Sequence, residues 1–155
     1  MGDLSGDLAS TGSGTAMLAR TMNDKTAVVA AIPMFAKLEP RSLEAIATLA
    51  KTITVPAETV LLREGEPAGS FYVIVEGTVR IERLGRFVRS ILAGGFIGEV
   101  AMIEGSTRTA TAICATPCDL LEFGTFEFGR LLATFPDVRA RVEAAVARRP
   151  HPEAT

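Results

Sequence analysis

Short hydrophobic segments separated by turn residues occupy the middle of the chain, from Thr52 to Phe123. These segments are rich in β-branched and aromatic residues, and glycine or proline stands between most of them, as is typical of strands and turns. The pattern predicts strands at residues 53–55, 59–63, 71–76, 78–83, 86–92, 109–115 and 119–123. In residues 78–83, Val79 and Ile81 alternate with polar residues, so we expect one buried face. Many short strands with regular turns predict an antiparallel barrel, sandwich or jelly roll.

Apolar residues at helical spacing precede and follow these strands. Before them, residues 28–35 predict a short helix that Pro33 interrupts. Ser42 is the expected N-cap of a second helix, whose apolar face lies within residues 43–50.

The pattern becomes helical again after Phe123. Thr125 is the expected cap of a helix over residues 126–135. Pro136 then begins a last helix, which is expected to end at Pro150.

The charge balance and the rarity of histidine exclude several classes of function. Sixteen Lys and Arg residues against 18 Asp and Glu residues give a net charge of −2, whereas a nucleic-acid-binding domain normally carries a basic excess. His151 is the only histidine, so a Ser-His-Asp triad and a multi-histidine metal cage are excluded. Cys114 and Cys118 are too few for a disulfide framework or a four-cysteine zinc site, and they suit a reducing compartment.

The sequence shows neither a membrane-spanning apolar run nor a signal peptide. Residues 1–25 are rich in Gly, Ser, Thr and Asp, which predicts a flexible leader or linker. No apolar run approaches the roughly 20 residues needed to cross a bilayer, and the first residues lack the basic and apolar regions of a signal peptide. We therefore expect a cytoplasmic chain with one folded domain over residues 26–149 and a tail over residues 150–155.

One segment, residues 94–114, interrupts the strand pattern with the sequence GGFIGEVAMIEGSTRTATAIC. A short helix that opens after Gly98 presents unpaired backbone N–H groups, which favour an anion. Arg108 follows this helix and offers fixed donors that suit a phosphate. Glu99 offers acceptors that suit a sugar hydroxyl. Together these groups suit a ligand with one phosphate and one sugar.

Residues 94–114 resemble the phosphate-binding cassette of the cyclic nucleotide-binding domain family. The family pattern is an apolar residue, Gly-Glu, any residue, a small residue and an apolar residue, followed after a spacer by Arg, Ser/Thr and Ala; residues 97–102 and 108–110 meet it. A second family signature, which ends in four apolar residues and Gly, matches residues 61–77. Two motifs in the right order make the resemblance specific. One departure is Thr107, where many members have proline.

This resemblance covers about residues 27–149 and implies a fold. The expected fold class is mainly β with flanking helices. Its centre is an antiparallel, jelly-roll-like β-roll, with an N-terminal helical bundle, a short cassette helix and two C-terminal helices.

The resemblance also implies the role of each matching residue in binding a cyclic nucleotide. Glu99 would accept a hydrogen bond from the ribose 2′-hydroxyl, and Arg108 would pair with the cyclic phosphate. The other implied contacts are the backbone amides of Gly98, Val100, Ala101 and Ala110, the side chain of Thr109, and an apolar wall of Val79, Ile81 and Ile97. In this family the last helix often covers the base, so Arg148 or Arg149 is expected there, and spacing from Arg108 favours Arg149.

The expected ligand is cAMP, with cGMP as the alternative, because the Thr109 hydroxyl suits a guanine edge as well. No cofactor, metal or nucleic acid is expected. The effector, either an attached domain or a partner protein, is not identified by the sequence.

Two other classes of function compete with this sensor hypothesis. A degenerate member of the fold would bind no nucleotide and act in protein–protein contact, but the intact Glu99 and Arg108 count against it. An enzyme with a β-roll of the cupin type would need histidine ligands on its strands, and these strands contain none.

Overall fold

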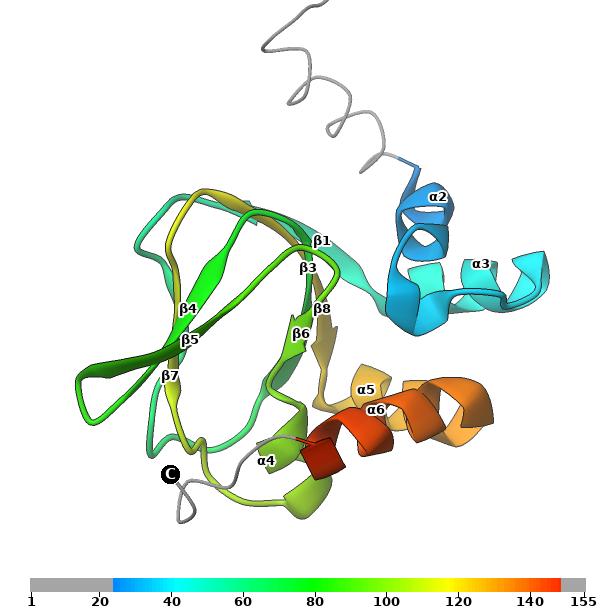
Figure 1. Cartoon of the computed structure of the whole chain (residues 1–155). Helices are drawn as coiled ribbons and strands as arrows, with labels where there is room; N and C mark the ends of the chain where they lie inside the picture. The colour runs from blue at the N-terminus through cyan, green and yellow to red at the C-terminus, as the bar shows by residue number, and fades with distance from the viewer. Residues whose placement is uncertain (1–23, 149–155) are drawn as a thin grey trace, which may run out of the picture.

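Two four-stranded antiparallel sheets form the centre of the structure, a computed structural model that describes residues 24–148. The first sheet has the strand order β1-β8-β3-β6, and the second has the order β2-β7-β4-β5. The strands are β1 (Lys51–Val55), β2 (Val60–Leu62), β3 (Ser70–Glu76), β4 (Val79–Arg83), β5 (Arg86–Ile91), β6 (Phe96–Ile97), β7 (Thr111–Cys114) and β8 (Cys118–Gly124). Together the sheets make the expected β-roll (Figure 1).

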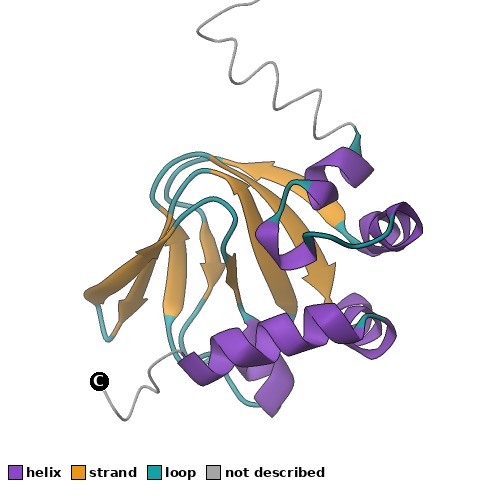
Figure 2. Ribbon diagram, turned by 45° about the vertical axis from the view of Figure 1, so that its right-hand side comes forward, coloured by secondary structure: helices purple, strands orange, loops and turns teal. Residues whose placement is uncertain are grey.

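Helices precede, interrupt and follow the strands. They are α2 (Lys25–Ala30), the 3₁₀ helix η2 (Pro33–Phe35), α3 (Pro40–Leu49), α4 (Glu99–Glu104), α5 (Thr125–Thr134) and α6 (Pro136–Arg148). Figure 2 shows them gathered on one side of the roll. The expected fold class is therefore confirmed.

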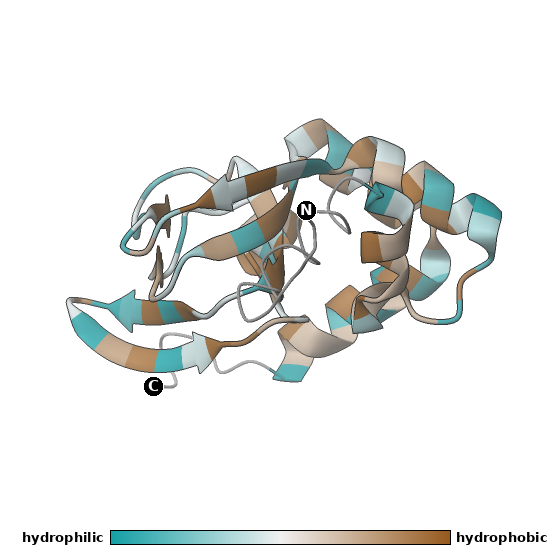
Figure 3. Ribbon diagram, turned by 90° about the horizontal axis from the view of Figure 1, so that it is seen from above, coloured by the Kyte–Doolittle hydropathy of each residue, from teal (hydrophilic) through white to brown (hydrophobic). Residues whose placement is uncertain are grey.

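Strand β3 is buried on both faces, and this explains its unbroken apolar run. Phe71 and Val73 point into a core shared with the helices, whereas Tyr72 and Ile74 point into a second core between the two sheets. This division follows from the alternation of side chains along a strand. Figure 3 colours each residue by hydropathy, and hydrophobic residues are seen as brown bands along the strands of the roll.

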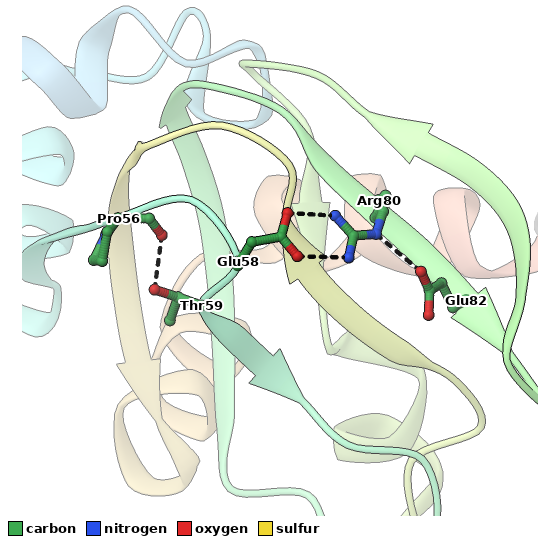
Figure 4. Close-up of polar contacts among 5 residues, drawn as sticks. All are labelled: Pro56, Glu58, Thr59, Arg80 and Glu82. Atoms are coloured by element: carbon green, nitrogen blue, oxygen red, sulfur yellow. Dashed lines mark hydrogen bonds and ion pairs between the residues drawn. The ribbon is translucent and has the colours of Figure 1, made fainter.

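The expected alternation in β4 is also present. Val79 and Ile81 are buried in the core between the sheets, while Arg80 lies on the opposite face and is partly exposed. There Arg80 donates from Nη2 and Nη1 to the two carboxylate oxygens of Glu58, at 2.8 and 2.9 Å, and from Nε to Glu82 at 2.9 Å (Figure 4). This ion pair connects the β1–β2 turn to β4.

Several predicted boundaries differ from the structure. Ser42 is not an N-cap, because α3 begins at Pro40, whose ring suits the first helical position. Thr125 is the first residue of α5 rather than its cap. Lys25, assigned to the leader, begins α2.

The cassette region also departs from the predicted strands. The two-residue strand β6 was not predicted from the sequence, and β7 begins at Thr111 rather than at residue 109. Residues 1–23 of the predicted leader, the tail and Arg149 lie outside the described residues.

Candidate functional site

A pocket lies between the β-roll and α4, and most of the residues predicted from the cassette border it. The predicted residues in its wall are Ile97, Gly98, Glu99, Val100, Ala101, Arg108, Thr109 and Ala110. Ile81, also expected on the apolar wall, lines it as well. The structure thus brings residues from β4, β6, α4 and the segment before β7 to one cavity.

Glu99 and Arg108 are the only charged side chains buried within residues 24–148, with exposed fractions of 0% and 6%. Glu99 is the first residue of α4, and Arg108 follows that helix. Burying a charge is costly unless it is paired or hydrogen-bonded. Attraction by the carboxylate of Glu99 acts on Arg108 and favours the charged form of its guanidinium. The pocket wall therefore holds an anion and a cation that interact.

Two backbone carbonyls hold the guanidinium of Arg108. Its Nη1 atom donates to the oxygen of Gly98 at 2.8 Å, and its Nη2 atom donates to the oxygen of Ser70 at 2.5 Å. Burial lowers the pKa of Arg108 from its ordinary value, and attraction by Tyr72 and Glu99 opposes that change. An arginine stays charged under these conditions, so the pocket carries a fixed cation.

The backbone of Arg108 is fixed by the loop between β2 and β3. Its N–H donates to the oxygen of Glu66, and its own oxygen accepts from the N–H of Gly65, both at 2.8 Å. Pro67 and Thr107 form an isolated bridge beside these bonds. The two sequence motifs, in residues 61–77 and 94–114, therefore meet at Arg108.

Gly98 is needed at the start of α4 for conformational and steric reasons. Its φ angle of 96° is in the left-handed region that other residues rarely adopt. A Cβ atom there would lie 2.8 Å from the oxygen of Ser70 and 3.2 Å from Nη1 of Arg108. Only glycine at residue 98 therefore allows α4 to begin this close to Ser70 of β3 and to the side chain of Arg108.

One of the predicted contacts is not brought to the pocket. Val79 does not line it; this side chain is fully buried in the core between the sheets, where β4 pairs with Cys114 of β7. Both Val79 and Ile81 point inward, but only Ile81 reaches the pocket. Arg149 lies outside the described residues.

Sequence reasoning did not identify several residues of the wall. They are Leu62, Arg83, Val88, Arg89, Thr111, Ala112 and Val146. Arg83 and Arg89 come from the hairpin of β4 and β5, where Arg89 lies opposite Ile81. Alternation from Ile81 would have placed Arg83 on the pocket side, whereas Arg89 required the register of the hairpin.

Helix α6 reaches the pocket through Val146. Val138 and Val142 of the same helix are fully buried in the helical core. Arg141 donates from Nη1 to the oxygen of Met34 in η2 at 2.8 Å. The helix therefore connects the pocket to the N-terminal helices.

Within residues 24–148, no group of three His, Cys, Asp or Glu side chains could hold a metal ion. None of the helices in the same range is both long and apolar enough to span a lipid bilayer.

Comparison with known proteins identifies relatives of this sequence. A family model for the cyclic nucleotide-binding domain matches residues 52–135. The chain is 36% identical over 111 residues to a cyclic nucleotide-gated potassium channel of Mesorhizobium japonicum, covering 72% of this chain and 31% of the channel. It is 34% identical over 100 residues to the cAMP-activated global transcriptional regulator CRP of Escherichia coli, covering 61% of this chain and 48% of the regulator. The chain thus spans half or less of the length of these relatives.

Solved structures show the same fold at lower sequence identity. The regulatory domain of Toxoplasma gondii PKA with cAMP matches with a TM-score of 0.72 and 20% identity, over 88% of this chain and 53% of that one. The catabolite activator protein of Thermus thermophilus matches with a TM-score of 0.68 and 24% identity, over 76% of this chain and 57% of that one.

Proposed function

The chain belongs to the cyclic nucleotide-binding domain family, and from this premise we propose that it is a regulatory module that senses cAMP. In this proposal the ligand occupies the pocket between the β-roll and α4, and its binding repositions α6. The site carries out no reaction; it converts the presence of a small molecule into a change of shape.

The observation that carries the proposal is the buried pair of Glu99 and Arg108 in the pocket wall. Burying two charges is costly, and their place in the wall of a cavity supports a role in binding a ligand. A cyclic nucleotide offers one negative phosphate and one ribose hydroxyl, which match a guanidinium and a carboxylate. The pair would therefore recognise both ends of the sugar phosphate.

Arg108 retains donors for the phosphate in this arrangement. A guanidinium has five N–H donors, and two of them are used on the oxygens of Gly98 and Ser70. The remaining three would face the phosphate oxygens, while Glu99 would accept from the 2′-hydroxyl. Amides from Gly98 to Ala101 and of Ala110 would complete the contact, because the first N–H groups of a helix lack intrahelical partners.

The base would lie against the apolar part of the pocket. Ile81 and Ile97 line it, and Thr109 stands beside Arg108. We propose cAMP as the ligand because relatives include a cAMP-activated regulator and cAMP-bound regulatory domains. In this proposal cGMP is the competing ligand, since a threonine hydroxyl suits the guanine edge too.

Binding would be transmitted through α6. Val146 lines the pocket, α4 packs against α6, and Arg141 joins α6 to η2. If the ligand contacts α4 and Val146 more favourably in one of two positions of α6, binding shifts the population of molecules toward that position. The free energy of this shift cannot exceed the difference between the ligand's affinities for the two conformations. The helices at both ends of the domain would then change position together.

The folded unit is proposed to be one domain over residues 26–149 that acts in the cytoplasm. The chain spans 31% of the potassium channel and 48% of the transcriptional regulator that it resembles. An attached domain or a separate protein would receive the signal.

Calorimetric titration of the purified protein with cAMP, cGMP and 5′-AMP tests the proposal. Saturable binding of a cyclic form at micromolar or lower concentration, with weak binding of 5′-AMP, is the expected result. The sample must first be shown to be folded and free of carried-over nucleotide. An absence of heat with both cyclic forms would instead favour a module that acts in protein–protein contact.

A further inference from the structure

We propose that Ser70, Tyr72 and Glu122 form a positioning network that holds the guanidinium of Arg108 at the ligand pocket. None of these three residues lies in the cassette. The inference rests on the proposed function, because Arg108 is the proposed phosphate contact. It assigns to this chain a set of side chains on which the affinity for the phosphate depends.

The network begins at the backbone of Ser70. Its carbonyl oxygen accepts one of the two hydrogen bonds that fix the end of the Arg108 side chain. Ser70 is also the first residue of β3, directly after the irregular loop from Leu62. Strand ends have few ladder bonds to restrain them, so the direction of this carbonyl depends on other contacts of Ser70.

Glu122 of β8 supplies such a contact. Its Oε2 atom accepts from the hydroxyl of Ser70 at 2.9 Å and from the hydroxyl of Tyr72 at 3.3 Å. Tyr72 and Glu122 lie opposite each other in the β3–β8 ladder. Ser70 stands two residues before Tyr72, and therefore on the same face of β3. One carboxylate oxygen thus joins both hydroxyls of this face.

A second hollow next to Arg108 explains why restraint is needed. Its wall includes Ser70, Tyr72 and Arg108, together with Glu66 from the loop between β2 and β3. The guanidinium therefore borders two cavities, of which only the first contains Glu99. Without the carbonyl of Ser70, the side chain would have space to turn away from the ligand pocket.

Charge also connects the network to the arginine. Burial and the carboxylate of Glu122 raise the pKa of Tyr72, and Arg108 acts on it in the opposite direction. Tyr72 is thus close enough to both charges to interact with each.

Titration of single variants with cAMP tests the network. Ser70→Ala keeps the carbonyl but removes the hydroxyl bond, and we expect it to weaken binding about fivefold, the usual weight of one hydrogen bond. Glu122→Ala should weaken binding at least as much, whereas Glu122→Gln should restore most of the affinity because its amide oxygen still accepts. Thr54→Val is the matched control. It removes an exposed side-chain hydrogen bond to Asp119, which lies in β8, the strand that also carries Glu122.

A double-mutant cycle separates positioning from general damage to the fold. Arg108→Lys keeps a charge but cannot bridge two carbonyls with one planar fork. If Ser70 acts through Arg108, Ser70→Ala should change affinity less than twofold in the Arg108→Lys background. A full effect of Ser70→Ala in that background would overturn the inference, as would unchanged affinity in both Ser70→Ala and Glu122→Ala.

A measurement without ligand keeps this inference distinct from the proposed function. The Nη2–H signal of Arg108 in ¹⁵N NMR spectra reports the bond to the oxygen of Ser70, so it should exchange slowly with water in the wild type and in Thr54→Val, and faster in Ser70→Ala. Failure of the wild type to bind any cyclic nucleotide would remove the proposed function alone. Equal exchange in all three proteins would remove the positioning network, whatever the ligand.

Discussion

The Nη1 atom of Arg108 lies 2.8 Å from the carbonyl oxygen of Gly98, and a Cβ built on Gly98 would lie 3.2 Å from the same nitrogen. The start of α4 and the guanidinium therefore share a space that admits no side chain on residue 98. The left-handed φ angle of 96° adds a second reason for glycine. A small change at residue 98 thus affects both the helix and the cation.

Gly98→Ala is expected to destabilise the fold by about 2–4 kcal/mol, because steric contact with Ser70 adds to the strain of the left-handed backbone. It should also weaken cAMP binding by displacing Arg108. Urea unfolding and calorimetric titration measure the two effects.

Gly105→Ala serves as the control for this substitution. Gly105 also has a positive φ, of 67°, but a Cβ there meets nothing within 4 Å. It should cost about 1–2 kcal/mol from backbone strain alone and leave binding unchanged. Equal effects of the two substitutions on binding would contradict the steric argument.

Arg108→Ala is expected to lower cyclic nucleotide affinity by about 2–5 kcal/mol, because the ligand phosphate would lose its charged partner. The variant also leaves the oxygens of Gly98 and Ser70 without their donor. Titration of a sample with a cooperative unfolding transition measures the loss. Arg139→Ala is the control, because Arg139 is exposed and pairs with Glu143 on the surface of α6. Near-unchanged binding by folded Arg108→Ala would refute the phosphate contact.

Glu99→Gln is expected to weaken cAMP binding less than Arg108→Ala, because an amide oxygen still accepts from the 2′-hydroxyl. The loss should be about 1–2 kcal/mol, the difference between a charged and a neutral acceptor. With 2′-deoxy-cAMP, wild type and variant should bind alike. If Glu99→Gln weakened the binding of cAMP and of 2′-deoxy-cAMP by the same factor, Glu99 would not be the ribose contact.

The sequence was sufficient to predict the region around α4 because glycine, acid and arginine mark it within a short segment. The two motifs lie far apart in the chain, yet Gly65 and Glu66 of one bond directly to Arg108 of the other. The central strands were also predictable, since their alternation reflects burial on one or both faces.

Other features depend on tertiary contacts that no local pattern contains. Strand β6 has only two residues, Phe96 and Ile97, and exists because they pair with Val73 and Tyr72. Both inward residues of β4 looked equivalent, but the position of the pocket distinguishes Val79 from Ile81. The contact of Val146 with the pocket depends on how α6 packs, which its own periodicity does not give.

The Glu58–Arg80 pair on the outer face of the roll should make stability depend on pH. The hydrogen bond from Arg80 lowers the pKa of Glu58 below its ordinary value of 4.5. A carboxyl group with a depressed pKa in the folded state stabilises fully above its unfolded pKa, and this contribution disappears as pH falls through the folded pKa. The wild type should therefore melt at a higher temperature than Glu58→Gln at pH 7, and the difference should shrink as the pH falls below 4.5 and disappear once Glu58 is protonated in the folded protein. A difference that stays constant throughout this acid titration would show that charge is not the cause. The wild type and Glu58→Gln should bind cAMP equally, because Glu58 does not line the pocket.

Cys114 should be inert to alkylating reagents while the protein is folded. Its side chain is fully buried, and burial, followed by the hydrogen bond and charge of Cys118, raises the pKa of its thiol from 9.0 to about 12. The thiolate is the reactive form, so at pH 8 only a small fraction of Cys114 is reactive, and that fraction is shielded from reagent.

Treatment with iodoacetamide at pH 8, followed by intact-mass measurement, should leave Cys114 unmodified in native protein and modify it in urea. A Cys118→Ser variant removes the second thiol and assigns the label to Cys114. Rapid labelling of Cys114 in the native state of that variant would show that the core between the sheets opens far more often than its packing indicates.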